Sequence, residues 1–173
     1  MIKEKAAKFV VNQVLKNTDF QEQSFSSVIN DAISFLILMP EDERDFRYSM
    51  DVLAYLYENK KEVMILTADY RVSLLPIHLR RYAFGHAIRD TNKINLPSKE
   101  LVSKLLKRRF DAVIDLNQKE QLFYSYVSGI VNAKVRIGFT KLLADKTFNI
   151  QIANNETNPK ISYKNLLNCL RML

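Results

Sequence analysis

Three short polar segments, each directly after an apolar run, contain the residues best suited to hold a ligand. Residues 40–45 (PEDERD) follow ISFLILM, residues 68–70 (ADY) follow EVMILT, and residues 117–120 (NQKE) follow AVIDL. Carboxylate, amide and guanidinium groups can bind a polar molecule through hydrogen bonds. The candidate ligand-binding residues are therefore Glu41, Asp42, Arg44, Asp69, Asn117 and Gln118.

The apolar runs before these segments indicate an α/β domain. Uninterrupted apolar runs are typical of strands buried on both faces, as in a parallel sheet. We expect strands at residues 33–39, 62–67, 84–89, 112–116 and 135–139, and an edge strand at 147–152. Helical periodicity predicts helices at 2–16, 46–57, 74–82, 99–109, 119–129 and 161–172. Ser98 is the expected N-cap of the helix from Lys99.

This alternation predicts one Rossmann-like, doubly wound and mainly parallel sheet with an added N-terminal helix. Residues 1–30 would form that helix and a polar connection (17–27), and residues 31–173 the α/β domain. In doubly wound sheets a ligand binds beyond the carboxyl ends of the strands, where the strand order reverses. The three polar segments are expected to meet at that edge.

Residues 110–139 resemble the closing βαβ unit of the N-terminal domain of the heptosyltransferases, a family of GT-B glycosyltransferases. That family has a YD-x-VIDL strand, a helix ending in small residues, and an RIGF strand. The matching residues here are Phe110, Asp111, Val113, Ile114, Asp115, Leu116, Gly129, Ala133, Arg136, Ile137, Gly138 and Phe139. The resemblance extends from about Ile33 to the last helix and implies the acceptor-side half of a GT-B fold.

The resemblance also implies a role for Asp45. In the heptosyltransferases a turn of the form R-x-G-A-L-G-D follows the first strand, and its Asp is thought to act as a base on the acceptor hydroxyl. Asp45 falls on that Asp, but Glu41 and Arg44 replace the glycines. A loop with side chains there cannot bring its backbone as close to a ligand. Asp45 could instead stabilise a helix N-terminus.

Composition and motifs restrict the remaining classes of function. The chain has 173 residues, a net charge of +7 and one cysteine, Cys169, which we expect to be a buried thiol. His78 and His86 lack cysteine or carboxylate neighbours at a metal spacing, so no metal is expected. Three scattered glycines (Gly85, Gly129 and Gly138) form no phosphate-binding motif, so no cofactor is expected. No targeting or membrane-spanning segment is visible, and a cytoplasmic location is the default.

Two surfaces suggest partners. The N-terminal helix has apolar residues Ile2, Ala6, Phe9, Val10 and Val14 near one face, and we expect that face to pack on the domain or on a second subunit. The basic segment KLLKRR offers Lys104, Lys107, Arg108 and Arg109 either as a solvated helix end or as a nucleic-acid contact.

Three hypotheses follow. The first is a non-catalytic module that binds a partner protein, a second copy of itself or a small polar ligand, because the fold is retained while the loop glycines and a donor-binding domain are missing. The second is an enzyme half that needs a separate donor domain, with Asp45 as its base. The third is a basic nucleic-acid-binding protein.

Overall fold

The computed structural model describes residues 2–16 and 25–173. The N-terminal elements, up to the end of the third strand, are α1 (Ile2–Lys16), α2 (Val28–Asp31), β1 (Ser34–Leu38), α3 (Glu43–Tyr48), α4 (Met50–Glu58), β2 (Glu62–Ala68), the 3₁₀ helix η1 (Asp69–Leu74), α5 (Ile77–Arg80) and β3 (Ala83–His86). The later elements are the 3₁₀ helix η2 (Ile88–Asp90), α6 (Lys99–Leu106), β4 (Arg109–Asp115), α7 (Leu122–Ile130), β5 (Asn132–Phe139), α8 (Ala144–Thr147), β6 (Ile150–Ile152) and α9 (Pro159–Met172).

The strands form one six-stranded sheet in the order β3-β2-β1-β4-β5-β6, and every neighbouring pair is parallel. The predicted Rossmann-like, doubly wound fold is therefore confirmed. Strand order reverses between β1 and β4, whose register pairs Leu38 with Asp115. The loops after these two strands thus flank the position where ligands bind in such folds.

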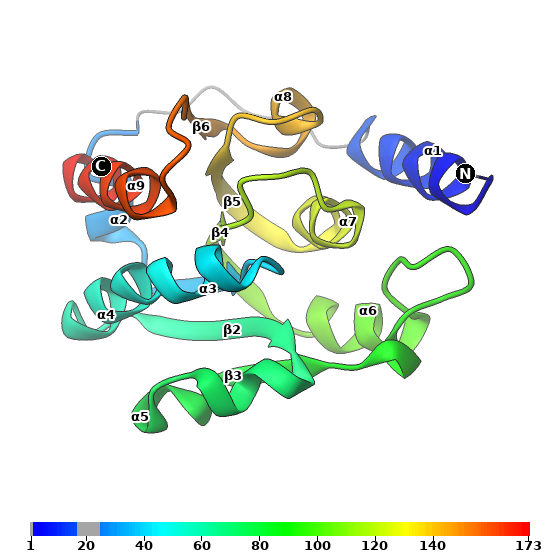
Figure 1. Ribbon diagram of the computed structural model, residues 1–173, viewed down its shortest axis with the longest axis horizontal. Coiled ribbons are helices and arrows are strands. Elements are labelled where there is room, and N and C mark those ends of the chain that lie inside the picture. Colours follow the sequence, from blue (N-terminus) through cyan, green and yellow to red (C-terminus); the bar gives the residue numbers. More distant parts are fainter. Residues whose placement is uncertain (1, 17–24) are drawn as a thin grey trace.

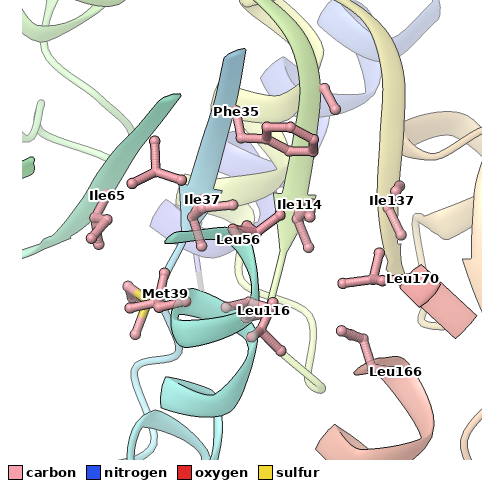
Figure 2. Packing of buried hydrophobic residues seen from close by; sticks show 14 of the residues in the cluster. Phe35, Ile37, Met39, Leu56, Ile65, Ile114, Leu116, Ile137, Leu166 and Leu170 are labelled. Carbon is pink, nitrogen blue, oxygen red and sulfur yellow. The ribbon is translucent and has the colours of Figure 1, made fainter. Parts of the chain in front are cut away.

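Helices cover both faces of the sheet (Figure 1). Alternate residues of β1 point to opposite faces, because successive side chains of a strand alternate. Phe35, Ile37 and Met39 pack with Leu56 of α4 and with Leu166 and Leu170 of α9 (Figure 2). Leu36 and Leu38 join the other cluster, with α6 and α7. Burial on both sides explains the uninterrupted apolar run of β1.

The helix α1 has the predicted bounds but buries a different face. Ala7, Val11 and Leu15 are its buried residues, in a cluster with Leu96 and Leu143. Of the predicted apolar face, Ile2 and Phe9 are exposed, so that assignment was wrong by about one position around the helix. The helix approaches α7 closely at Gly129, where a Cβ would lie 2.7 Å from Leu15 Cδ2. The helix packs on the domain through α7.

Several boundaries differ from the predictions for local reasons. The predicted helix 46–57 is two helices, α3 and α4, that meet at Ser49, whose hydroxyl donates to the Phe46 carbonyl. The predicted helix 74–82 shortens to α5 after the 3₁₀ helix η1, and helix 119–129 begins only at Leu122. The predicted domain boundary at residue 30 lies inside α2. Most of the predicted connection 17–27 lies outside the described residues.

Other expectations concern strand ends and caps. Ser98 caps α6 as predicted, since its Oγ accepts a hydrogen bond from the Leu101 N–H. That helix ends at Leu106, and Arg109 begins β4 rather than closing the helix. The third strand ends at His86 rather than at residue 89. The edge strand β6 spans only residues 150–152, because Thr147 belongs to α8. Cys169 is partly exposed rather than fully buried.

Candidate functional site

The loop after β1 and the loop after β4 are tied together at the reversal of strand order. The side chain of Asn117 accepts a hydrogen bond from the Glu41 N–H at 3.1 Å and donates to the Met39 carbonyl at 3.3 Å. It also donates to Asp115 Oδ1 at 2.8 Å. Asn117 is buried. One amide side chain therefore fixes the path of the first polar segment relative to the second.

Asp115, at the end of β4, forms a buried ion pair with Lys141. The Lys141 Nζ lies 2.6 Å from Asp115 Oδ2, and the side chains are 3% and 0% exposed respectively. Asp115 Oδ1 accepts hydrogen bonds from the Asn117 N–H and its side-chain amide. Both carboxylate oxygens are thus occupied by protein donors. This pair holds the loop after β5 against the loop after β4.

The helix α3, which follows the first loop, has its N-terminus closed by the chain itself. The Asp42 carboxylate accepts hydrogen bonds from the backbone N–H groups of Arg44 and Asp45, and these bonds hold the pKa of Asp42 below its usual range. A helix N-terminus binds phosphate through such free N–H groups. With Asp42 in that place, the usual phosphate position of a Rossmann-like fold is taken.

Asp45 is buried, with 9% of its surface exposed, and Gln118 donates a hydrogen bond to its Oδ1 at 3.0 Å. Burial, followed by repulsion from Asp42, raises the pKa of the Asp45 carboxyl. The helix cap expected of Asp45 is therefore supplied by Asp42. A small cavity of about 270 Å³ brings five of the predicted residues together: Glu41, Asp42, Asp45, Asn117 and Gln118.

Two predicted residues lie outside that small cavity. Arg44 is exposed and lines neither it nor the larger cavity beside it. Asp69 lines the larger cavity, which has a volume of about 950 Å³ and lies at the carboxyl ends of β1, β2 and β3. Glu41 is shared by both.

The larger cavity, here called the carboxyl-edge pocket, is formed by the loops after three strands and by the start of α7. Its lining residues are Pro40, Glu41, Ala68, Asp69, Tyr70, Arg71, His86, Ala87, Ile88, Arg89, Thr91, Asn95, Phe123 and Tyr124. Gly85 makes room for one of them, because a Cβ there would lie 2.1 Å from Asp69 Oδ1. The pocket therefore combines carboxylate, guanidinium, imidazole and aromatic groups.

Aromatic residues on the carboxyl-edge pocket contact one another. His86 stacks on Phe123 with ring centroids 4.5 Å apart, and its Nε2 is hydrogen bonded to the Tyr124 hydroxyl at 3.1 Å. Burial lowers the pKa of His86, with Asp69 and Asp90 acting in the opposite direction, so the imidazole is neutral at pH 7. Burial also raises the pKa of Tyr124, which keeps its hydroxyl protonated. Phe123 and Tyr124 are both buried.

Arg71 also lines the carboxyl-edge pocket and was missed from the sequence. It is 8% exposed, its Nη2 donates to the Glu41 carbonyl at 2.5 Å, and its Nε donates to the Tyr70 hydroxyl at 3.2 Å. The rings of Phe46 and Tyr70 lie 5.1 and 5.4 Å from its guanidinium carbon. An arginine in a polar segment usually lies on the surface, so the sequence offered no reason to expect a buried one. The signal that could have marked Arg71 as a site residue was its position shortly after the end of a strand.

Elsewhere, the basic segment is exposed as predicted: Lys104, Lys107, Arg108 and Arg109 all face solvent. Arg108 and Arg109 line a groove of about 1000 Å³ at the amino ends of the strands, together with Lys60, Lys61 and Arg81. His78 contacts the Tyr57 ring. Within residues 2–16 and 25–173, no cluster of three or more His, Cys, Asp or Glu residues could hold a metal ion. No helix in the same ranges is long and apolar enough to cross a membrane.

The fold and these pockets define a Rossmann-like α/β domain without the glycine-rich phosphate loop. Residues 3–173 match the model of a family of unknown function, DUF6913, and the chain belongs to that family. No curated protein matches it. A solved structure, the C-domain of bacterial malonyl-CoA reductase with NADP, is similar at a TM-score of 0.41 and 10% identity. The match covers 89% of this chain and 27% of that chain, and at this TM-score we draw nothing from it.

Proposed function

We propose that this chain is a non-catalytic binding module, related to the N-terminal domain of the heptosyltransferases, and that the carboxyl-edge pocket is its binding site for a small polar ligand. The observation that supports this most is the pocket itself, about 950 Å³ at the edge where doubly wound folds bind ligands. Its volume is in the range of small-molecule sites, and its wall mixes aromatic rings with a few polar groups.

A ligand screen on the whole chain tests this proposal. We expect at least one small polar metabolite to raise the melting temperature and to shift the backbone amide resonances of the pocket segments, residues 68–71 and 86–89. The variant Gly85→Leu serves as the comparison, because the new side chain would displace Asp69 from the pocket. Both responses to the ligand should be weaker in this variant. Sugar transfer by the purified chain alone, from any nucleotide-sugar donor, would overturn the non-catalytic part of the proposal.

The module could also bind through its surface to a protein, including a second copy. The edge strands β3 and β6 each leave one side unpaired within the described sheet, and such edges can accept another strand. Capture of the tagged chain from its native lysate, with and without nuclease, separates the possibilities. A stoichiometric protein that survives nuclease supports the binding module, and a donor domain among the captured proteins supports the split enzyme described next.

A second candidate function is the acceptor-side half of a split glycosyltransferase. The buried Asp45 supports it, because a carboxylate with a raised pKa is a stronger base than an exposed one. Asp45→Asn should abolish turnover in a pair reconstituted with a donor domain. Unchanged turnover would remove this candidate. Because the ionised Asp45 is disfavoured in the folded chain, the same substitution should leave stability at pH 7 unchanged or higher, so lost turnover would not reflect unfolding.

A third candidate is nucleic-acid binding at the amino ends of the strands. It is supported by the groove that Arg108 and Arg109 share with Lys60, Lys61 and Arg81. Phosphate contacts make affinity fall steeply with salt. Binding that is absent at low salt, or that does not change with salt, would exclude it.

A further inference from the structure

The charge of Arg71 lacks a close counter-charge. Among residues 2–16 and 25–173, the ion pairs within 4.0 Å are Arg47–Glu43 and Lys141–Asp115, and Arg71 is in neither. Its two bonded nitrogens donate to neutral oxygens, a carbonyl and a phenol. Within the same ranges, its Nη1 has no hydrogen-bond partner and is shielded from water.

Such an arrangement is unfavourable for an empty site. A buried charge is retained in proteins when it is paired or bound, and a buried N–H donor without an acceptor is rare. Burial raises the pKa of the Glu41 carboxyl, and the charge of Arg71 opposes that rise. Glu41 is nevertheless exposed and is not within ion-pair distance. Arg71 therefore keeps one buried donor, Nη1, to which no residue of the described ranges offers an acceptor.

The other groups in the pocket limit which ligand could supply that acceptor. Arg89 is a second, exposed cation that lines the same pocket. Asp69 and Glu41 also line the pocket, and both residues are exposed. Two carboxylates would repel a second anionic group on the ligand, while they would accept hydrogen bonds from hydroxyl or ammonium groups.

We propose that the carboxyl-edge pocket binds a small organic molecule with a single phosphate or carboxylate group, held by Arg71 with help from Arg89, and with hydroxyl or ammonium groups facing Asp69 and Glu41. Phosphate and carboxylate share the geometry that a guanidinium recognises. This inference rests on the proposed function, since it names the ligand class of the same pocket.

Access to Nη1 requires one movement. Tyr70 covers one side of the guanidinium and is 72% exposed, so its ring is free to turn outward on binding. The Tyr70 hydroxyl would leave Nε as it does so. The oxyanion could then contact Nη1 while Nη2 keeps its bond to the Glu41 carbonyl.

Matched pairs of probes test the inference on the full chain by ¹⁵N-resolved titration at fixed ionic strength. The pairs are AMP with adenosine, ribose 5-phosphate with ribose, and benzoate with benzamide. We expect the anionic member of at least one pair to shift the amides of residues 68–71 and 86–89 with an affinity at least tenfold above its neutral partner. The phosphate and carboxylate pairs also show which oxyanion the site prefers.

Arg71→Met should reduce the affinity for that anion at least tenfold, and Arg71→Lys should restore only part of it, because lysine lacks the planar fork. Arg47→Met is the matched control, since it removes an equal charge from an exposed position outside the pocket and should leave binding unchanged. Arg71→Met should also unfold at the same or a higher denaturant concentration than the unsubstituted chain, because the substitution removes an unpaired buried charge.

Equal binding of charged and neutral partners, or binding unaffected by Arg71→Met, would overturn this inference and leave the proposed function standing. Failure of every probe to shift the pocket amides would also overturn it. The proposed function fails separately, if the unbiased screen finds no small ligand of any charge in the pocket.

Discussion

Lys141 Nζ lies 2.6 Å from Asp115 Oδ2, with both side chains removed from solvent, at the carboxyl end of the strand beside β1. This ion pair closes the sheet edge between the loops that follow β4 and β5. Together with the hydrogen bonds of Asn117, it connects the loops that follow β1, β4 and β5.

Lys141→Ala should destabilise the chain by about 3–5 kcal/mol, because it leaves the Asp115 carboxylate buried without its counter-charge. Urea unfolding measures the effect. Lys164→Ala, at an exposed position of α9, is the control and should change the unfolding free energy by less than about 0.5 kcal/mol. The double variant Asp115→Asn with Lys141→Met should recover much of the loss. A double variant no more stable than Lys141→Ala would mean that the charge itself is not the cause.

Asp111 should make stability depend on pH in the acid range. Hydrogen bonds from the backbone N–H groups of Ser34 and Ile33 hold the pKa of the Asp111 carboxyl below its usual value. A carboxyl with a lower pKa in the folded chain stabilises the fold above its unfolded pKa of about 3.9, and this contribution disappears as pH falls through the folded pKa.

Asp111→Ala should therefore cost about 1–3 kcal/mol at pH 7 and less as the pH falls below about 4. Chemical unfolding at a series of pH values measures the difference. Asp51→Ala removes an exposed carboxylate at the start of α4 and is the control. A cost for Asp111→Ala that is the same at pH 7 and pH 3 would contradict the assigned role.

Two glycine positions should respond differently to the same substitution. At Gly138 in β5, a new Cβ would lie 2.5 Å from two ring carbons of the buried Phe148, so Gly138→Ala should destabilise by about 1–3 kcal/mol through overpacking. At Gly129, the nearest atom is the end of the flexible Leu15 side chain, and alanine also favours the helix by about 1 kcal/mol. Gly129→Ala should therefore be nearly neutral in thermal unfolding, and equal losses at both positions would contradict this contrast.

Asn117→Ala should loosen the loop after β1 while leaving the strands protected. The substitution removes the acceptor of the Glu41 N–H and the donor to the Met39 carbonyl. Hydrogen exchange should become faster at Glu41 by at least tenfold, with β1 amides unchanged. Asn165→Ala, at an exposed position of α9, controls for the loss of an amide. Unchanged exchange at Glu41 would show that another contact holds the loop.

Strands were predictable from the sequence where burial on both faces removes ambiguity. Runs such as ISFLILM and AVIDL are almost entirely apolar, so they have no polar face that could be confused with the buried one. Their strands begin and end within three residues of the predicted bounds. The buried face of α1 was harder to predict, because apolar residues occur around much of that helix. Only tertiary packing selects Ala7, Val11 and Leu15 for burial. The short helices α2 and η1 carry no periodicity long enough to recognise.

The polar segments of the candidate site were predictable by position, and their chemistry was not. Any residue after a parallel strand reaches the carboxyl edge, which is why Glu41, Asp69 and Asn117 were found. Arg71 and Lys141 read as ordinary surface cations, because nothing local indicates burial. The partner of Lys141 is 26 positions away, and the rings around Arg71 come from two different elements.

The central place of β1 in the sheet also has a consequence for how the chain folds. Its two neighbours are β2, which follows soon after, and β4, whose Asp111 lies 77 positions beyond Ser34. Closing so long a segment is entropically costly, and sheets with distant pairings fold slowly. Until residues 109–115 emerge from the ribosome, β1 keeps one edge without its native neighbour. The nascent chain is most exposed to incorrect strand pairing during that interval.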